Sequence, residues 1–147
     1  MNEKKALVTG SSRGIGRAIA LTLARDGCKV LVHCAGNTAK AEETKALIES
    51  AGGKAEIIKA DLCDTAETKL LAAKAADCDI LVLNASLQYR NRWDKITLEE
   101  CYNQLNCNFV SSLLLIQSAA EHMKQSGWGR IITIGSVQEA KPHPDML

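Results

Sequence analysis

The segment TGSSRGIG, residues 9 to 16, is the most informative stretch of this 147-residue sequence. It follows the apolar run Ala6-Leu7-Val8 and leads into a helix-patterned segment from Ile15 to Arg25. A glycine-rich turn between a strand and a helix predicts phosphate binding, because the free N–H groups and the positive dipole end of the helix face the anion. The order of these elements indicates a diphosphate ligand more strongly than glycines alone would.

Three glycines have separate expected roles in this turn. Gly10 permits a tight exit from the strand, and Gly14 removes a side chain that would hold a pyrophosphate away from the backbone. Gly16 lets the helix pack closely on the sheet. Such turns also occur in proteins without a cofactor, so the interpretation depends on the rest of the chain.

Apolar runs alternate with helical periodicity along the whole chain. The runs predict five strands, at Ala6–Thr9, Lys29–His33, Glu56–Lys59, Ile80–Leu83 and Arg130–Ile134. Strands that alternate with helices form right-handed crossovers and a parallel sheet that is covered on both faces. We therefore expect an α/β fold with a doubly wound, Rossmann-like parallel sheet, incomplete at its C-terminal side, and one dinucleotide-binding domain over residues 1–147.

Two helices are expected in the first third of the chain. The first places Ile15, Ile19 and Leu23 on one face and ends at Gly27. The second covers about Thr38 to Ala51 and stops at the following pair of glycines. Both lie between predicted strands, as the alternating order requires.

Two further helical regions carry N-terminal capping signals. Asp64 and Glu67 form a candidate capping box for the third helix. Its apolar face is expected at Ala66, Leu70 and Ala73. Thr97 and Glu100 form a second candidate box, and the helix that follows is expected to continue through Asn106 to about Gln125.

In a sheet of this kind, ligands bind beyond the carboxyl ends of the strands, where the strand order reverses. The segments that follow four of the strands are expected to meet at this rim. They are residues 9–16, 33–37, 84–86 and 135–138. The composition changes only in the loop-like tail from Lys141 to Asp145.

The composition argues against several classes of partner. The sequence is 46% hydrophobic with a net charge of +1, and it has no basic stripe with interleaved aromatic residues, so no nucleic-acid partner is expected. Its N-terminus has no long apolar export segment. Polar residues interrupt the most apolar helix, residues 109–123, so no membrane span is expected and this helix is predicted to be buried.

The cysteines and histidines give no sign of a disulfide framework or a metal site. The six cysteines are scattered through hydrophobic segments without a C-x-x-C pair, which favours reduced thiols in a cytoplasmic protein. His33, His122 and His143 have no ligand-like spacing to one another or to a cysteine. No metal site is therefore expected.

Three motifs lie at or near the expected rim. They are the turn T-G-x-x-x-G-x-G, the pair Asn84-Ala85 after the fourth strand, and the run from Ile131 to Ser136, which follows a helix with Asn108. This combination resembles the short-chain dehydrogenase/reductase family. In that family the glycine turn holds a dinucleotide, an Asn-Ala-Gly segment braces the central strand, and Asn, Ser, Tyr and Lys side chains support hydride and proton transfer. Here Ser86 replaces the usual glycine and adds a hydroxyl beside the nicotinamide.

The resemblance implies roles for individual residues. Ser136 would hold the substrate oxygen, Asn108 would support a water-linked proton relay, and Asp61 would contact the adenine. Ser136 or Asn108 taken alone could equally be a structural polar side chain, but their spacing of 28 residues and their order favour the catalytic roles. The dinucleotide would be held by Thr9, Gly10, Ser12, Arg13, Gly14, Ile15, Gly16, His33, Asp61, Leu62, Asn84, Ala85 and Ser86.

The sequence departs from the family at the proton donor. The family's Tyr-x-x-x-Lys motif follows the serine, whereas neither Tyr89 nor Tyr102 has a lysine four residues later. A phenol needs such help, because its pKa near 10 leaves it protonated at neutral pH. We therefore expect a truncated dehydrogenase rather than an expressed half-domain, since a sheet that stops at residues 130–134 leaves an apolar edge. The 147 residues alone are expected to be inactive.

The residues after the second strand favour NADP(H) over NAD(H). An acidic residue there would bond the ribose hydroxyls of NAD and repel a 2′-phosphate, but no carboxylate occurs in residues 33–41. Arg13 lies within the glycine turn and is a candidate partner for the 2′-phosphate, with Lys40 as a weaker second candidate.

The leading functional interpretation is an oxidoreductase that interconverts a secondary alcohol and a ketone. By the resemblance, the substrate is a small-molecule or carrier-linked carbonyl compound, such as a 3-oxoacyl thioester. A sugar-acid or polyol dehydrogenase and a non-catalytic dinucleotide-binding module remain alternatives. An epimerase-type relative is disfavoured, because its turn has two residues between the first glycines and this one has three. By the same resemblance, the complete protein is expected to be a homo-oligomer, a tetramer, joined through the helix at 106–125, whose run Leu113–Ile116 exceeds what one buried stripe needs.

Overall fold

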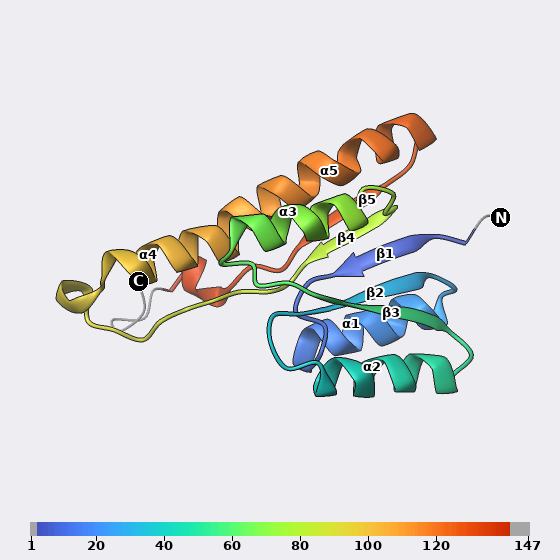
Figure 1. Ribbon diagram of the computed structural model, residues 1–147, viewed down its shortest axis with the longest axis horizontal. Helices are drawn as coiled ribbons and strands as arrows, with labels where there is room; N and C mark the ends of the chain where they lie inside the picture. Colours follow the sequence, from blue (N-terminus) through green and yellow to red (C-terminus); the bar gives the residue numbers. More distant parts are fainter. Residues whose placement is uncertain (1–2, 142–147) are drawn as a thin grey trace.

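The computed structural model describes residues 3–141, which form one parallel sheet with helices on both faces (Figure 1). The strand order is β3-β2-β1-β4-β5. The strands are β1 (Lys5–Val8), β2 (Lys29–Cys34), β3 (Lys54–Lys59), β4 (Ile80–Leu83) and β5 (Arg130–Thr133). This order confirms the predicted doubly wound fold, and the strand order reverses between β1 and β4. The tail beyond Lys141, with His143, lies outside the described residues.

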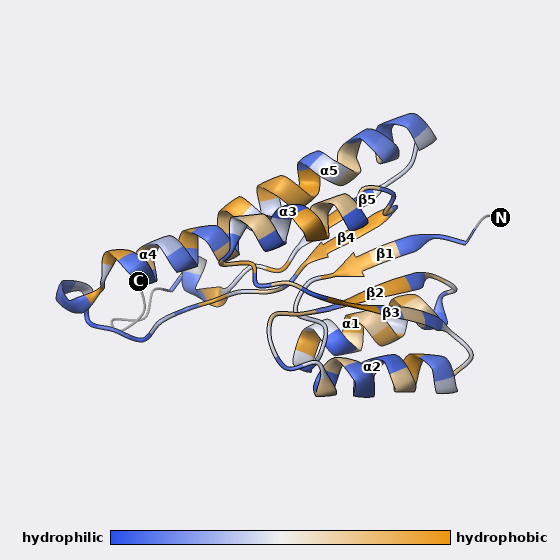
Figure 2. Ribbon diagram, in the orientation of Figure 1, coloured by the Kyte–Doolittle hydropathy of each residue, from blue (hydrophilic) through white to orange (hydrophobic). Residues whose placement is uncertain are grey.

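The helices divide between the two faces of the sheet. In Figure 1, α1 (Gly14–Arg25) and α2 (Ala39–Ser50) lie below the strands, and α3 (Thr65–Lys74) and α5 (Ser111–Ser126) lie above. Successive strand residues point to opposite faces, so the strands β1 to β4 supply both cores. Leu7 of β1 packs in the core on the α3 and α5 side, whereas Ala6 and Val8 pack in the core on the α1 and α2 side. Figure 2 shows the inner strands in the hydrophobic colour.

The buried face of α1 differs from the prediction. Its buried residues are Gly16, Ala20 and Ala24, whereas Ile15 is 65% exposed. Ile19 and Leu23 are only half-buried at the margin of the core. The helix lies so close to the sheet that small residues fill the interface, and the large side chains pack at its sides.

The buried face of α3 was also predicted wrongly. Thr68, Leu71 and Ala72 are buried, and the predicted face of Ala66, Leu70 and Ala73 is exposed. The Thr68 hydroxyl donates a hydrogen bond to the Asp64 carbonyl at 2.9 Å, so its burial leaves no polar group unsatisfied. The predicted capping box is half correct. Asp64 caps the helix, but Glu67 accepts a hydrogen bond from the backbone N–H of Asp61.

A long helical segment crosses the upper face. The short helix η1 (Trp93–Lys95) precedes α4 (Leu98–Leu105), whose Thr97–Glu100 capping box is confirmed. A π-helical turn at Asn106–Val110 joins α4 to α5, and η3 (Val137–Glu139) follows β5. Only one face of α5 is buried, through Ser111, Leu115, Ala119 and Met123, so the prediction that residues 109–123 are buried holds for this face only.

Two apolar surfaces of this layer remain open among residues 3–141. We call the first the α4–α5 stripe, and its exposed side chains are Leu98, Tyr102, Leu105, Phe109 and Leu113. The second is β5, which forms one edge of the sheet and exposes Ile131 and Ile132, as the sequence predicted for a sheet that stops there. No helix in this part of the chain is both long and apolar enough to span a membrane.

Candidate functional site

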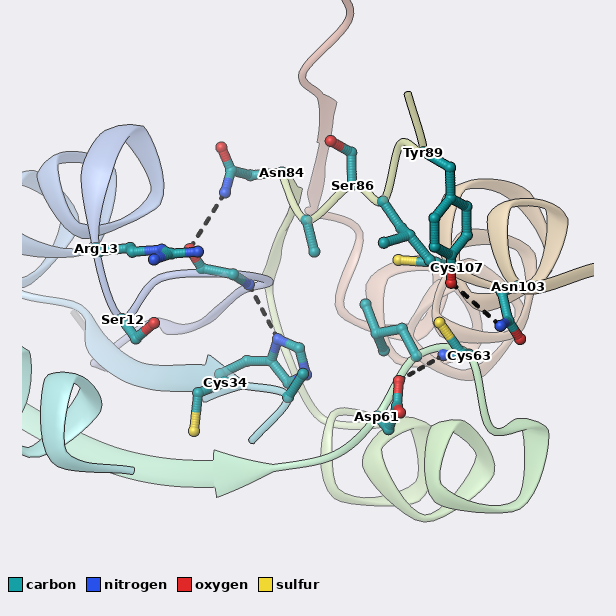
Figure 3. A pocket seen from close by; sticks show the side chains of 16 residues that line it. Ser12, Arg13, Cys34, Asp61, Cys63, Asn84, Ser86, Tyr89, Asn103 and Cys107 are labelled. Carbon is teal, nitrogen blue, oxygen red and sulfur yellow. Dashed lines mark hydrogen bonds between the residues drawn. The ribbon is translucent and has the colours of Figure 1, made fainter. Parts of the chain in front are cut away.

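A large cavity lies at the carboxyl ends of the strands, where the strand order reverses. Its volume is about 650 Å³, within the usual range for small-molecule sites. Figure 3 shows Ser12 and Arg13 on one side, Tyr89, Asn103 and Cys107 on the other, and Asn84 and Ser86 between them. Its walls include nine of the predicted binding residues, namely Gly10, Ser12, Arg13, His33, Asp61, Leu62, Asn84, Ala85 and Ser86.

Thr9 and Asn84 join the ends of β1 and β4 below the cavity. The buried Thr9 hydroxyl donates to the Val82 carbonyl at 3.3 Å and accepts from the backbone N–H groups of Asn84 and Ala85, at 2.9 and 3.0 Å. The Asn84 amide donates back to the Thr9 carbonyl at 2.9 Å. Thr9 is therefore absent from the cavity wall and supports the segment that forms it.

The glycines of the turn differ in what surrounds them. Gly10 and Gly14 have φ values of +66° and +58°, which favour glycine, and a Cβ on Gly14 would meet nothing within 4 Å. A Cβ on Gly16 would lie 2.5 Å from the Gly10 carbonyl oxygen and 2.7 Å from the Asn84 amide nitrogen. Gly16 therefore packs α1 against the turn itself and against Asn84. Gly14, Ile15 and Gly16 do not line the cavity.

Two arginines of this region have different surroundings. The Arg17 guanidinium donates to the Ser12 carbonyl at 2.7 Å, to the Thr44 hydroxyl at 2.9 Å and to the Glu43 carboxylate at 3.0 Å, which ties the turn to α2. No sequence pattern indicated this role. Arg13 lines the cavity, and among the described residues its guanidinium has no hydrogen-bond or ion-pair partner. Its charge is therefore available to an anion.

His33 lines the cavity but is bonded to the backbone through both ring nitrogens. The Gly10 N–H donates to Nδ1, and Nε2 lies 2.9 Å from the Ala60 carbonyl oxygen. Burial lowers the pKa of this imidazole below its usual value, more than the Ala60 carbonyl and Asp61 raise it. The ring therefore has no nitrogen left for a ligand. Within residues 3–141, no cluster of three His, Cys, Asp or Glu side chains could hold a metal ion.

The loop after β3 forms another wall of the cavity. Residues 135–138, which the sequence predicted at this rim, do not line the cavity. Asp61 accepts a hydrogen bond from the Cys63 N–H at 2.9 Å, and its own N–H is held by Glu67. Burial and the nearby Asp61 raise the pKa of the Cys63 thiol to about 12, so this thiol is neutral and a poor nucleophile.

The part of the wall that α4 and the following π-helical turn supply was missed in the sequence. Asn103 donates to the Tyr89 hydroxyl at 3.3 Å, and both residues line the cavity with Cys107. They come from a loop and a helix that are far from the glycine turn along the chain. No local pattern could have indicated this contact.

The two residues with predicted catalytic roles lie outside the cavity wall. Both polar atoms of the Asn108 side chain are bonded to the backbone of Leu87, at 2.8 Å each, and its backbone lies in the π-helical turn. The Ser136 hydroxyl accepts a hydrogen bond from the Gln138 N–H at 3.2 Å. Their roles stay predictions, and the two bonds of the Asn108 amide to Leu87 position the segment after β4.

The family described as short chain dehydrogenase matches residues 4–147. The chain belongs to this family. It is 35% identical over 145 residues to a 3-oxoacyl-[acyl-carrier-protein] reductase of Staphylococcus aureus, and the alignment covers 96% of this chain and 59% of that protein.

Solved structures agree with this family membership. A 3-oxoacyl (acyl-carrier-protein) reductase of Agrobacterium tumefaciens with NADP bound is 36% identical, with a TM-score of 0.90 over 97% of this chain and 56% of that one. The landomycin C-6 ketoreductase with bound NADP and rabelomycin is 34% identical, with a TM-score of 0.88 over 97% of this chain and 62% of that one. The chain therefore spans less than two thirds of the length of these relatives.

Proposed function

We propose that residues 1–147 form one dinucleotide-binding domain that prefers NADP(H). The proposal rests on Arg13, whose guanidinium is an unpartnered cation in the wall of the cavity, next to Gly14, where a Cβ would meet nothing within 4 Å. No carboxylate in residues 33–41 opposes a 2′-phosphate, and the nearby Glu43 carboxylate is already paired with Arg17. Two related structures with NADP support the same cofactor.

Replacing Arg13 with glutamine tests this preference. We expect NADPH binding to weaken by about 10- to 100-fold, because a charge-assisted hydrogen bond contributes roughly 1.5–3 kcal/mol. NADH lacks the 2′-phosphate, so its affinity is expected to change less than about threefold. Titration calorimetry with both dinucleotides measures the difference, and Arg25→Gln at the far end of α1 is the matched control. Equal losses for NADPH and NADH would contradict this role.

We further propose that the complete protein is an oxidoreductase that reduces a ketone or oxidises a secondary alcohol. The nicotinamide, when bound, supplies or accepts the hydride. A 3-oxoacyl thioester is the favoured substrate because two of the relatives are named as 3-oxoacyl-(acyl-carrier-protein) reductases. A sugar-acid or polyol dehydrogenase is the alternative. Turnover of 3-oxoacyl thioesters and sugar ketones by the complete protein decides between them, and turnover of neither would refute the proposal.

The 147 residues by themselves are proposed to bind the dinucleotide without turnover. They contain Ser136 and Asn108 but no Tyr-x-x-x-Lys sequence, so they lack a phenol whose pKa a neighbouring lysine could lower. This leaves a non-catalytic binding module as the second candidate function. NADPH oxidation by the 147-residue chain with any tested ketone would contradict the proposed inactivity.

All six cysteines are free thiols. Free thiols are typical of a reducing compartment, so we also propose that the protein is cytoplasmic.

We propose that the complete protein is a homo-oligomer that uses the α4–α5 stripe. Phe109 is 65% exposed and Leu98 is 74% exposed on this stripe, and contiguous apolar surfaces of this kind mark interaction sites. Phe109→Glu is expected to yield monomers at micromolar concentration, as measured by light scattering. Leu70→Glu on α3, an equally exposed leucine outside the stripe, is expected to leave the assembly intact. A monomeric wild-type protein would refute this proposal.

A further inference from the structure

The backbone and the ring of His33 are both bonded to the glycine turn. The Gly10 N–H donates to Nδ1 at 2.9 Å, the Ser11 N–H donates to the His33 carbonyl at 3.0 Å, and the His33 N–H donates to the Ser11 hydroxyl at 3.0 Å. Ser11 and His33 are both buried. The first two residues of the turn after Thr9 are thus held by one residue at the end of β2.

The hydrogen-bond partners determine the tautomer of the ring. Gly10 supplies an N–H, so Nδ1 must be an unprotonated acceptor. Ala60 supplies a carbonyl oxygen, so Nε2 must carry the proton. Only the neutral Nε2–H form satisfies both. In the imidazolium, a proton on Nδ1 would face the Gly10 N–H, and this bond would be lost.

We propose that His33 is a positioning residue of the dinucleotide site, whose neutral ring holds Gly10 in the conformation that receives the diphosphate and whose protonation releases it. This role rests on the proposed dinucleotide binding. It differs from the direct contact expected from the sequence, because the ring acts only through Gly10. Since Gly10 has a φ of +66° and begins the turn, a change in its N–H bond changes where the following N–H groups point.

The groups around His33 have opposite effects on the protonation of its ring. Asp61 on the loop after β3 favours the imidazolium, as would the diphosphate, whereas burial and the cationic Arg13 in the same cavity disfavour it. The other cavity residues near the ring are uncharged. They include Cys34 on the same strand and Asn84, Ala85 and Ser86 in the segment after β4. The Gly10 N–H, 2.9 Å from Nδ1, favours the neutral form, whereas the Ala60 carbonyl, at the same distance from Nε2, favours the imidazolium.

Two variants separate the two ring contacts. In His33→Asn, the side-chain oxygen lies as many bonds from the backbone as Nδ1 does, so it can still accept from Gly10. In His33→Gln, the amide nitrogen matches Nε2 and can still donate to Ala60. We expect His33→Asn to bind NADPH within about threefold of wild type at pH 7.5, and His33→Gln to bind about tenfold more weakly, because its Gly10 donor is left unsatisfied.

The pH dependence is the readout that a purely structural role would not produce. Calorimetric NADPH titrations at pH 7.5, 6.5 and 5.5 measure the affinities of wild type and His33→Asn. The ratio of the two affinities is compared between pH values, because protonation of the NADPH phosphate affects both proteins equally and cancels in the ratio. We expect wild type to lose up to about tenfold per pH unit once the pH falls below the ring's depressed pKa, while His33→Asn shows no such loss. A constant ratio, or tighter wild-type binding at low pH, would overturn the proposal.

NMR of the 147-residue chain without ligand gives an independent readout. At pH 7.5 we expect the Nε2–H tautomer and slow exchange of the Gly10 amide, with protection lost as the ring is protonated. The Nδ1–H tautomer would overturn the proposal. A folded chain that ignores NADPH at pH 7.5 refutes the dinucleotide site and this role with it. A chain that binds NADPH equally well with a charged ring refutes only the role of His33.

Discussion

Gly16→Ala is expected to destabilise the fold by about 1–3 kcal/mol, although alanine is the better helix former. The added Cβ would lie 2.5 Å from the Gly10 carbonyl oxygen and 2.7 Å from the Asn84 amide nitrogen. The backbone oxygen cannot rotate away, so α1 or the turn must shift. Because the turn forms the cavity wall, we expect NADPH affinity to fall at least tenfold, which corresponds to about 1.4 kcal/mol.

Ala18→Leu is the matched control for this experiment. It adds more volume to the same helix, but Ala18 is exposed and leucine is a good helix former, so a change within about 0.5 kcal/mol is expected. Urea unfolding measures the free energies, and calorimetry measures the affinities. If Gly16→Ala is as stable as wild type and binds NADPH normally, the close packing of α1 on the turn is not what shapes the site.

The approximate positions of the five strands and of the main helical segments were predictable because the signals are local, whereas the short helices η1 and η3 and the π-helical turn were not predicted. Apolar runs, the Thr97–Glu100 capping box and the glycine at the end of α1 each act over a few residues. The buried faces of α1 and α3 were not predictable in the same way. Hydropathy assigns Ile15 and Leu70 to the interior, yet the close approach of α1 selects small residues, and a local hydroxyl bond makes the burial of Thr68 favourable.

The glycine turn between β1 and α1 was predictable from sequence, but the supports around it were not. Thr9 and Asn84 could be singled out only as parts of motifs, and their mutual hydrogen bonds depend on β1 and β4 being neighbours. Arg17 carries no local signal, because a charged residue near the start of a helix usually faces solvent. The role of His33 depends on Gly10 and Ala60 meeting its ring from two other segments.

Thr9→Val is expected to lower the free energy of unfolding by about 2–4 kcal/mol, although valine has the same shape and favours strands. The hydroxyl accepts from the N–H groups of Asn84 and Ala85, and both would lose this partner in a buried place. The Val82 carbonyl loses little, because it also accepts from the Thr9 N–H at 2.9 Å. The unsatisfied donors therefore account for most of the expected cost.

Thr9→Ser separates the hydroxyl from the methyl group. Serine keeps the acceptor and removes one methyl, which is expected to cost about 1 kcal/mol. Urea unfolding of the two variants should therefore rank Thr9→Ser as the more stable protein. The NADPH affinity is expected to follow the same order, because Asn84 and Ala85 line the cavity and depend on this hydroxyl for their position. If Thr9→Val is the more stable variant, packing rather than hydrogen bonding joins β1 to β4 below the site.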